Sequence, residues 1–387
     1  MKQLSLLRDA RLVAASHHKG LLRQAYEVIR MKMRNPGLGA TEYFSFRLYD
    51  SEYLDGGEVE DFVGWREAGD VPLILNERTA VAHAWDKFTF AILAGAHGLP
   101  VAKLRAVYRP GIALKSRIAD VTLDSPAQLS AWLRTQQNWP LFAKPVYAVG
   151  GFGAFNFIGY RPEGDVLLTK RAEKIDVAQF VSKFVLNAGA KNDSHAYKRQ
   201  LGYLFQEVLR PHERIAALLE NETISGVRVI LIQDGSGVEI VSAEWKIVTG
   251  NSDTDNIRDY GHGNIGAQVD LASGQIRRVV DNKWPSAKLI THHPRTHRPL
   301  KGFVLPDWDE TLALCRRAAP KFPLMRIQHW DVALTDQGPR LLEVNDPGSL
   351  EGQIYGRGVL TDRMRALLVR HGNPSKHALA RRLSRTS

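Results

Sequence analysis

The sequence is poor in cysteine and in long apolar runs. Its 387 residues include one cysteine, so it cannot form an intramolecular disulfide, and Cys315 sits in a predicted helix where we expect it to be buried. No apolar run approaches the roughly 20 residues that a membrane-spanning helix needs. The amino terminus lacks the apolar core of a signal peptide, and the chain contains no repeat or low-complexity tract. These absences predict a cytoplasmic globular protein and exclude secreted, membrane-spanning and fibrous classes.

Charge is unevenly distributed along the chain. The net charge is +11, yet residues 1–35 hold eight Lys and Arg against two Asp and Glu, and residues 363–387 hold seven Lys and Arg and no acid. The two ends together exceed the total, so the middle is near neutral, and no central groove for nucleic acid is expected. The basic ends favour a solvated helix face and a frayed tail. The alternative is contact with an anionic glycan or a membrane surface.

Periodicity predicts helices near the amino terminus. Apolar residues recur at helical spacing and charged residues occupy another face: Leu22, Tyr26, Ile29, Met33, and then Arg23, Glu27, Arg30, Arg34. Asn35-Pro36-Gly37 ends this helix. The stretch from there to about residue 79 mixes acids, glycines and aromatics, which favours irregular α+β structure in an α-rich leader over residues 1–80.

The rest of the chain mixes helices and strands. Asp86 and Ser125-Pro126 are helix-start signals, and residues 177–185 and 309–318 also have helical patterns. The predicted strands cover residues 141–146, 203–209, 227–232, 238–248, 275–280, 329–334 and 340–345. Because strands and helices do not alternate regularly, we predict an α+β fold rather than a doubly wound parallel sheet.

The last predicted hairpin could bind a metal ion. The turn signal Thr335–Pro339 joins its strands, and directly opposed residues of such a pair point to one face. Asp331 can therefore lie opposite Glu343 or Asn345. Two carboxylates and an amide oxygen form a hard-oxygen set that suits Mg²⁺. A solvated charged face is the alternative, but opposed like charges are unfavourable without a counterion, so the pattern favours a metal site.

A lysine followed by glycines forms a second candidate site. Lys144 closes a predicted strand and precedes Gly150, Gly151 and Gly153. Glycines let backbone N–H groups approach phosphates, and a lysine adds a point charge. A flexible hairpin loop explains the same pattern equally well. The segment is not a Walker A loop, because no Gly-Lys-Ser/Thr follows.

Two other motifs favour ordinary structural roles. Residues 261–266 match G-x-G-x-x-G, but a strand and turn follow instead of a helix, which argues against dinucleotide binding. His292, His293 and His297 share a loop with Arg295 and Arg298. A surface loop or an anion contact is favoured there over a zinc site.

Taken in order, these segments resemble the ATP-grasp superfamily, and above all its sugar-transfer-associated branch, related to α-L-glutamate ligases. The resemblance covers about residues 85–358. It rests on Asp86-Lys87, Lys144-Pro145 with its glycines, Phe205-Gln206-Glu207-Val208, Gly226-Val227-Arg228, Asp255-Asn256 with the glycines that follow, and Asp331 with Glu343-Val344-Asn345. It implies an ATP-grasp fold with a first part over residues 81–208, a second over 209–362, and a basic tail over 363–387. Two α+β subdomains would clamp the nucleotide.

The resemblance also implies a role for each matched residue. Lys87 and Lys144 would hold phosphates, and Gly150, Gly151 and Gly153 would form a lid loop. Gln206, Glu207 and Val208 would be the hinge that meets adenine and ribose. Arg228 would lie near the γ-phosphate and Lys246 near the acyl group. The Mg²⁺ ligands would be Asp331, Glu343 and Asn345.

The activity implied by this resemblance is an ATP- and Mg²⁺-dependent ligase that joins a small carboxylate to an amine through an acyl phosphate. A sugar acid or glycan precursor is a candidate substrate. Two alternatives remain open at this point. One is a phosphotransferase without ligation, and the other is a non-catalytic, nucleotide-gated protein that binds an anionic polymer through its basic ends.

Overall fold

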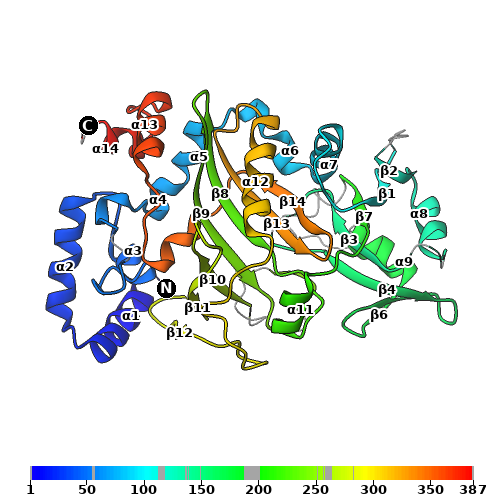
Figure 1. Ribbon diagram of the computed structural model, residues 1–387, viewed down its shortest axis with the longest axis horizontal. Helices are drawn as coiled ribbons and strands as arrows, with labels where there is room; N and C mark the ends of the chain where they lie inside the picture. Colours follow the sequence, from blue (N-terminus) through cyan, green and yellow to red (C-terminus); the bar gives the residue numbers. More distant parts are fainter. Residues whose placement is uncertain are drawn as a thin grey trace.

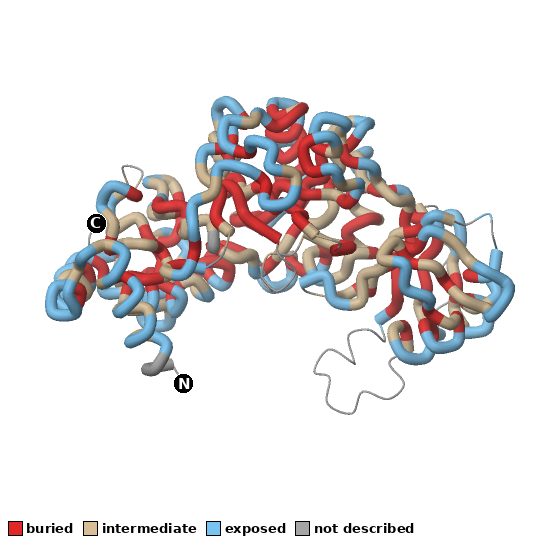
Figure 2. The backbone as a smooth tube through the Cα atoms, turned by 90° about the horizontal axis from the view of Figure 1, so that it is seen from below, coloured by how far each residue is buried: buried red, intermediate tan, exposed pale blue. Residues whose placement is uncertain are grey.

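The computed structural model describes residues 2–54, 57–111, 118–135, 137, 139–148, 150–186, 201–250, 252–255, 257, 264–281 and 283–385, and only the backbone of residues 2–4 and 351. The motif segments Asn256 and 261–263 lie outside the described residues. The strands form two sheets, further helices accompany them, and the amino-terminal region is helical (Figure 1). This arrangement confirms the α+β prediction. Figure 2 shows buried backbone running through the whole length of the molecule.

The regular elements of the leader's described part are all helices, joined by turns and loops. Its elements are α1 (Lys2–His17), α2 (Leu21–Arg34), α3 (Ala40–Ser45), η1 (Val59–Asp61), α4 (Trp65–Ala68), α5 (Asp70–Leu75) and η2 (Arg78–Ala80). The expected mixture with strands is wrong for these residues, which make only an isolated bridge from Asn76 to Met325. The reason is packing: short helices bury the aromatic residues of this stretch, including Tyr43, Phe46 and Phe62, in a core against α1 and α2.

The first sheet has the strand order β2-β1-β7-β3-β4-β5-β6. Its strands are β1 (Leu104–Tyr108), β2 (Ala119–Leu123), β3 (Leu141–Pro145), β4 (Phe155–Arg161), β5 (Val166–Thr169), β6 (Lys174–Asp176) and β7 (Tyr203–Gln206). The accompanying helices are α6 (Ala82–Trp85), α7 (Lys87–Ala96), α8 (Pro126–Leu133), α9 (Val177–Gln179) and η4 (Phe180–Val185). The predicted caps are confirmed: Asp86 accepts the Thr89 N–H at 2.8 Å, and Ser125 accepts that of Gln128 at 3.3 Å.

The second sheet is antiparallel, with the order β12-β11-β10-β9-β8-β13-β14. Its strands are β8 (Val227–Asp234), β9 (Gly237–Ile247), β10 (Ile265–Val269), β11 (Ile276–Val280), β12 (Leu289–Ile290), β13 (Ile327–Thr335) and β14 (Gly338–Asn345). The nearby helices are α11 (Glu213–Leu219), α12 (Trp308–Ala318), η6 (Ala319–Lys321) and η7 (Glu351–Tyr355). One face of this sheet buries Trp245 and Trp330 in a core shared with α12, and Cys315 of α12 is buried in the same core, which confirms the predicted burial of the cysteine. The opposite face carries the charged side chains described below.

The last hairpin has the predicted pairing with a tighter turn. Asp331 lies opposite Glu343 and His329 opposite Asn345, with a bulge after Asp331. The strands pair as far as Thr335 and Gly338, so the turn is shorter than the five-residue segment expected. Gly338 has a φ of +85°, which glycine adopts without strain.

The carboxyl-terminal basic segment is folded, so the expectation of a frayed tail is wrong for residues 363–385. Helices α13 (Asp362–His371) and α14 (Ala378–Leu383) bury apolar side chains against α5 and the second sheet: Met364, Leu367, Leu368, Leu379, Ala380 and Leu383. Several of its cations form internal ion pairs, such as that of Arg382 with Glu67 at 2.7 Å. A basic segment without acids can fold this way because the acids that neutralise it lie elsewhere in the chain.

A search for membrane-crossing segments covers the described residues only. Within those ranges, every helix is too short or too polar to cross a bilayer.

Candidate functional site

A group of charged side chains lines a cavity of about 270 Å³, to which both sheets contribute. Strands β3 and β7 contribute Phe142, Lys144 and Gln206, and helix α7 contributes Lys87. Strands β8, β9, β13 and β14 contribute Arg228, Glu244, Lys246, Asp331 and Glu343, and the other charged residues of the lining lie on connecting segments. The predicted site residues that line it are Lys87, Lys144, Gly150, Gly151, Gln206, Glu207, Val208, Arg228, Lys246, Asp331, Glu343 and Asn345. Residues distant in sequence therefore converge as expected, although their chemical roles stay predictions.

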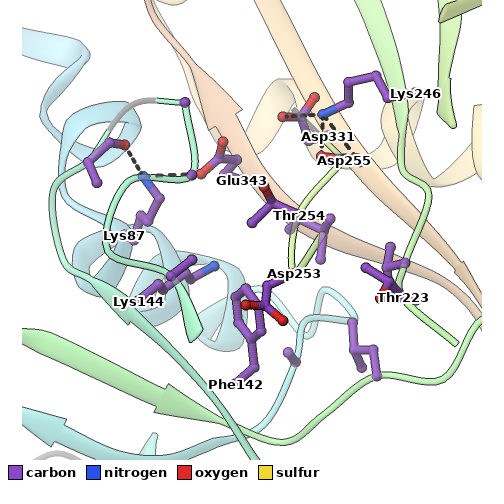
Figure 3. A pocket seen from close by; sticks show the side chains of 18 of the residues that line it. Lys87, Phe142, Lys144, Thr223, Lys246, Asp253, Thr254, Asp255, Asp331 and Glu343 are labelled. Carbon is purple, nitrogen blue, oxygen red and sulfur yellow. Dashed lines mark hydrogen bonds and ion pairs between the residues drawn. The ribbon is translucent and has the colours of Figure 1, made fainter. Parts of the chain in front are cut away.

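One cluster centres on Asp331. Its carboxylate accepts two hydrogen bonds from Arg228, from Nε and from Nη2, each at 2.8 Å. Lys246 Nζ lies 3.3 Å from Asp331 and 3.2 Å from Asp255, as Figure 3 shows. The strand register explains this convergence, because Arg228 on β8 lies directly opposite Asp331 on β13 and their side chains share a face.

The ion pairs control ionisation in this cluster. Burial alone would raise the pKa of Asp331, but Arg228 and Lys246 outweigh it and hold that pKa well below its usual range. Burial likewise would lower the pKa of Lys246, and the carboxylates of Asp255 and Asp331 reverse this, so its pKa is raised. Asp331, Arg228 and Lys246 are therefore charged at neutral pH, and the ion pairs among them offset the cost of burying these charges.

A second cluster links α7 to the last hairpin. Lys87 Nζ lies 3.2 Å from Glu343 and donates a hydrogen bond of 2.9 Å to the Ala148 carbonyl (Figure 3). Burial raises the pKa of Glu343, and Lys87 and Lys144 lower it, with a net lowering. The side chain of Lys87, the first residue of α7, is thus positioned by its contact with Glu343 of β14.

Lys144 differs from the other cations of the cavity. It has no hydrogen-bond or ion-pair partner among the described residues, although it lies partly buried at the end of β3. Burial lowers the pKa of its ammonium group to about 8, with Glu343 opposing this effect. A desolvated cation that makes no direct ion pair attracts an anion into the cavity more strongly than a paired one.

The glycine loop adopts a conformation that needs glycine. Gly150, Gly151 and Gly153 have φ values of +66°, +74° and +73°. A Cβ on Gly151 would lie 2.8 Å from Thr254 Oγ1. Gly153, which does not line the cavity, accepts a hydrogen bond from the Tyr203 hydroxyl through its carbonyl. The glycine loop therefore lies close to Thr254, in the segment that connects β9 and β10 of the second sheet.

The predicted hinge follows β7 directly. Glu207 exchanges two hydrogen bonds with Lys103: its Oε1 accepts the Lys103 N–H at 2.8 Å, and its own N–H donates to the Lys103 carbonyl at 3.0 Å. Gln206 is buried, and Gln206, Glu207 and Val208 all line the cavity. The hinge is therefore fixed against the loop that precedes β1.

The hairpin donors fit a hard divalent cation. Asp331, Glu343 and Asn345 present two carboxylates and one amide to the same cavity, and Asn345 Nδ2 lies 3.4 Å from Asp331 Oδ2. The described residues include no cluster of three or more His, Cys, Asp or Glu side chains placed to hold a metal alone. A third protein oxygen would come from Asn345, which suits Mg²⁺ because this ion usually shares its shell with water and phosphate oxygens.

The structure adds two residues to the site: Glu244, which the sequence analysis did not identify, and Asp255, to which it assigned no role. Glu244 lies opposite Arg228 and accepts a hydrogen bond of 2.6 Å from the Tyr355 hydroxyl. The signal was its position two residues before Lys246, since alternate residues of a strand share a face. Asp255, quoted only as part of a motif, pairs with Lys246 and accepts the Gly226 N–H at 2.9 Å.

A second cavity of about 340 Å³ adjoins the first along the same sheet face. Arg228, Glu244 and Ser349 line both cavities. The second is also lined by the segment that includes η7, with Arg357 exposed in it and without a hydrogen-bond or ion-pair partner in the described part of the chain.

The His- and Arg-rich loop does not belong to this site. Arg295 donates to the carbonyls of Leu219 and Glu220, and Arg298 to that of Ala217. Cations at these last carbonyls of α11 satisfy acceptors that lack helical partners. This placement is in line with the structural interpretation favoured for this loop.

Comparison with known proteins agrees with the sequence-based resemblance. A profile of the family described as sugar-transfer-associated ATP-grasp matches residues 70–367. Among solved structures, the chain is similar to the ATP-grasp ligase PsnB bound to a minimal precursor, with 17% identity, a TM-score of 0.35, and coverage of 76% of this chain and 63% of that one. It is also similar to an L-amino acid ligase from Bacillus licheniformis, with 12% identity, a TM-score of 0.36, and coverage of 71% and 45%.

The chain spans less than two thirds of the length of each of these two solved proteins. No curated protein matches the chain. The family profile covers well over half of the sequence and includes every predicted site residue. The chain therefore belongs to the sugar-transfer-associated ATP-grasp family and has the ATP-grasp fold.

Proposed function

We propose that this protein is an ATP- and Mg²⁺-dependent ligase that activates a small carboxylate as an acyl phosphate and transfers it to an amine. The observation that carries the proposal is Lys144, a desolvated cation without a partner among the described residues, in a cavity that also contains the Asp331 and Glu343 carboxylates. Cations for phosphates and oxygen donors for a divalent ion are the two requirements of phosphoryl transfer.

The first sheet and α7 would bind the nucleotide. Lys144 would form an ion pair with phosphate oxygens, and Lys87 would exchange part of its contact with Glu343 for a phosphate contact. Gly150 and Gly151 can bring backbone N–H groups close to phosphates, because these two residues carry no side chain. The adenine would lie along residues 206–208, where hinge backbone and apolar side chains line the cavity.

Arg228 would stabilise the transferred phosphoryl group. Asp331 engages its Nε and Nη2, while Nη1 has no hydrogen-bond partner among the described residues. The guanidinium therefore stays oriented by Asp331 and keeps donors for an incoming oxygen. Such preorganised charge is worth more in a partly buried site than in water, because no solvent must reorganise during the reaction.

Asp331, Glu343 and Asn345 would hold the Mg²⁺ ion. When bound, the ion would supply charge neutralisation on the phosphate oxygens. Lys246, which contacts Asp331 from the other side, would keep that carboxylate ionised and would face the acyl group.

The second cavity offers a place for the carboxylate substrate, because it adjoins the first at Arg228 and Glu244. A carboxylate directed toward Arg228 would approach the γ-phosphate from this side. Arg357 would attract a further anionic group, which favours a substrate with more than one acidic or strongly polar group, such as a sugar acid. Closure of the glycine loop would exclude water from the acyl phosphate.

The test is ADP release from ATP and Mg²⁺ with pools of amino acids and uronic acids, followed by mass analysis of the product. We expect ADP formation that depends on both a carboxylate and an amine, with a product lighter by one water than their sum. Lys144→Met should abolish it, while Lys376→Met, at an exposed lysine of the carboxyl-terminal region, should not.

Other outcomes identify the alternatives. A phosphorylated product without an amide would indicate a phosphotransferase. ATP binding that Asp331→Ala leaves unchanged, with no turnover on any pool, would indicate a nucleotide-gated binding protein and contradict the proposed activity.

A further inference from the structure

Helix α2 exposes a continuous apolar stripe to solvent. The exposed fractions are 89% for Leu22, 63% for Tyr26, 61% for Ile29 and 80% for Met33. These positions are four, three and four residues apart, so their side chains lie on one face of the helix. Single exposed apolar residues are ordinary, but a contiguous apolar patch marks an interaction surface.

The fold fixes this orientation of the helix. On the inner face, Gln24 Nε2 donates to the carbonyls of Ala10 at 2.9 Å and Lys19 at 2.7 Å. Glu27 accepts a hydrogen bond of 2.6 Å from the Tyr43 hydroxyl, and Met31 is buried. Exposure of the stripe is therefore a property of the packed leader and not of a loosely attached helix.

Cations border the stripe on both sides. At about 100° per residue, Arg23 and Arg30 lie on one flank and Lys32 on the other. Arg30 and Lys32 are exposed and make no hydrogen bond or ion pair within the described ranges. Glu27, the acid of this helix, is already engaged by Lys19 at 2.8 Å. The outer surface of α2 is thus apolar at its centre and positive at its edges.

The other basic end of the chain lacks this arrangement. Arg363, Arg365 and Arg382 pair with Asp234, Asp61 and Glu67, and the apolar residues of α13 and α14 are buried. These three cations therefore stabilise the fold, and the exposed cations of this end, such as Arg370 and Lys376, do not border an exposed apolar stripe.

We propose that α2 is an interfacial helix that docks this protein on an anionic lipid bilayer. The four apolar side chains would enter the boundary between headgroups and acyl chains, and the flanking cations would contact lipid phosphates and carboxylates. A second copy of the chain is a poorer occupant, because a two-fold pairing of this face would bring the unpaired cations Arg30 and Lys32 of both copies together, and Glu27 is already engaged by Lys19 and Arg23.

The location of α2 is compatible with docking. It lies at the left edge of Figure 1, at the opposite end of the molecule from β3, β4 and β6, and it lies outside residues 70–367, which match the family. A membrane under α2 would leave the cavity between the sheets unobstructed. The inference is independent of the proposed activity.

The test measures binding of the full-length protein to vesicles by co-sedimentation. Vesicles of phosphatidylcholine with about 30% phosphatidylserine should bind the protein, and vesicles of phosphatidylcholine alone should bind it weakly. Raising the salt concentration should weaken binding to the anionic vesicles. Replacing Leu22, Tyr26, Ile29 and Met33 by Ser should reduce binding by at least roughly tenfold, because it removes the buried apolar area.

Matched variants separate the stripe from general changes. Leu73→Ser with Leu289→Ser also replaces exposed apolar residues, 54% and 46% exposed, and should leave binding unchanged. Arg30→Glu with Lys32→Glu should weaken binding, and the same changes at Arg370 and Lys376, also exposed cations, should not. Thermal unfolding should be the same for all four variants, since each replaced side chain is exposed.

Three results would overturn the proposal. The first is failure of the unaltered protein to bind anionic vesicles. The second is binding that the stripe variant retains in full. The third is that the unaltered protein forms a dimer by light scattering and does not bind vesicles, while the stripe variant is monomeric. This result would assign the face to a second copy of the chain. Retention on polyglutamate without vesicle binding would likewise assign it to an acidic protein.

Discussion

The cavity between the sheets and the outer face of α2 arrange similar side chains in opposite ways. In the cavity, Arg228 and Lys246 are largely buried and paired with acids. On α2, Arg30 and Lys32 are exposed and unpaired among the described residues, and the large apolar side chains between them are exposed as well. The first arrangement stabilises charge for a small anionic ligand, and the second presents a broad amphipathic surface.

This difference predicts how substitutions in each region affect stability and binding. Each charge of the cavity depends on its neighbours, so a single substitution leaves another buried charge without a partner. The side chains on the outer face of α2 are exposed, so their substitution should affect binding and leave folding intact. The four predictions below test this contrast, from the largest expected effect to the smallest.

Glu343→Gln should reduce ADP formation about a thousandfold, equivalent to about 4 kcal/mol of lost transition-state stabilisation. The change removes an oxygen-donor charge and the partner of Lys87 at 3.2 Å. Steady-state ADP release measures it, with Glu163→Gln on an exposed turn as the control. Normal turnover in the Glu343 variant would remove the metal assignment.

Asp331→Asn should lower the free energy of unfolding by about 3 kcal/mol, because Arg228 and Lys246 would lose a buried counter-charge. Urea denaturation at neutral pH measures this cost. The charge reversal Arg30→Glu on α2 provides the comparison and should change stability by no more than about 0.5 kcal/mol. Equal costs at the two positions would contradict the contrast between a buried, paired charge and an exposed, unpaired one.

The two faces of α2 should respond differently to truncation. Met31→Ala, on the inner face at 6% exposure, should cost about 2 kcal/mol, whereas Leu22→Ala, at 89%, should be nearly neutral. Thermal unfolding of the two variants distinguishes them. A destabilising Leu22 variant would indicate that part of the chain covers the stripe.

The affinity for ATP should fall a few-fold as the pH rises through about 8, the value to which burial lowers the pKa of Lys144. The sign follows from the charge: the ammonium is protonated and attracts phosphate below this pH, and it loses its proton above it. Titration of ATP binding at several pH values measures the effect. Lys144→Met should remove this pH dependence, while Lys87→Met should keep it and move its midpoint to higher pH, because the charge of Lys87 lowers the pKa of Lys144.

Sequence reasoning was most successful where one strand or helix decides the outcome. The caps at Asp86 and Ser125 and the pairing of Asp331 with Glu343 depend on residues close in sequence, and all three are confirmed. The family resemblance is also confirmed, since the profile covers residues 70–367. The chemical roles of the site residues stay predictions that the variants above test.

Sequence reasoning failed where a segment's partner lies far away along the chain. Residues 363–385 looked like a frayed tail because their seven cations have no acids nearby. The acids that neutralise them include Asp61, Glu67 and Asp234, which only the fold brings close. The role of Glu244 was missed for the same reason, since its neighbours Arg228 and Tyr355 lie on other segments.

The sequence alone determined the local elements and the order of the motifs, because helical and strand periodicity, caps and turns depend on neighbouring residues. The tertiary structure alone decided which cations are paired and which are free. Lys144, Arg30 and Arg382 are chemically similar in the sequence, yet one lies unpartnered in a cavity, one is exposed, and one is tied to Glu67. Burial and the distance to an opposite charge set these differences, and both depend on contacts between residues far apart in the chain.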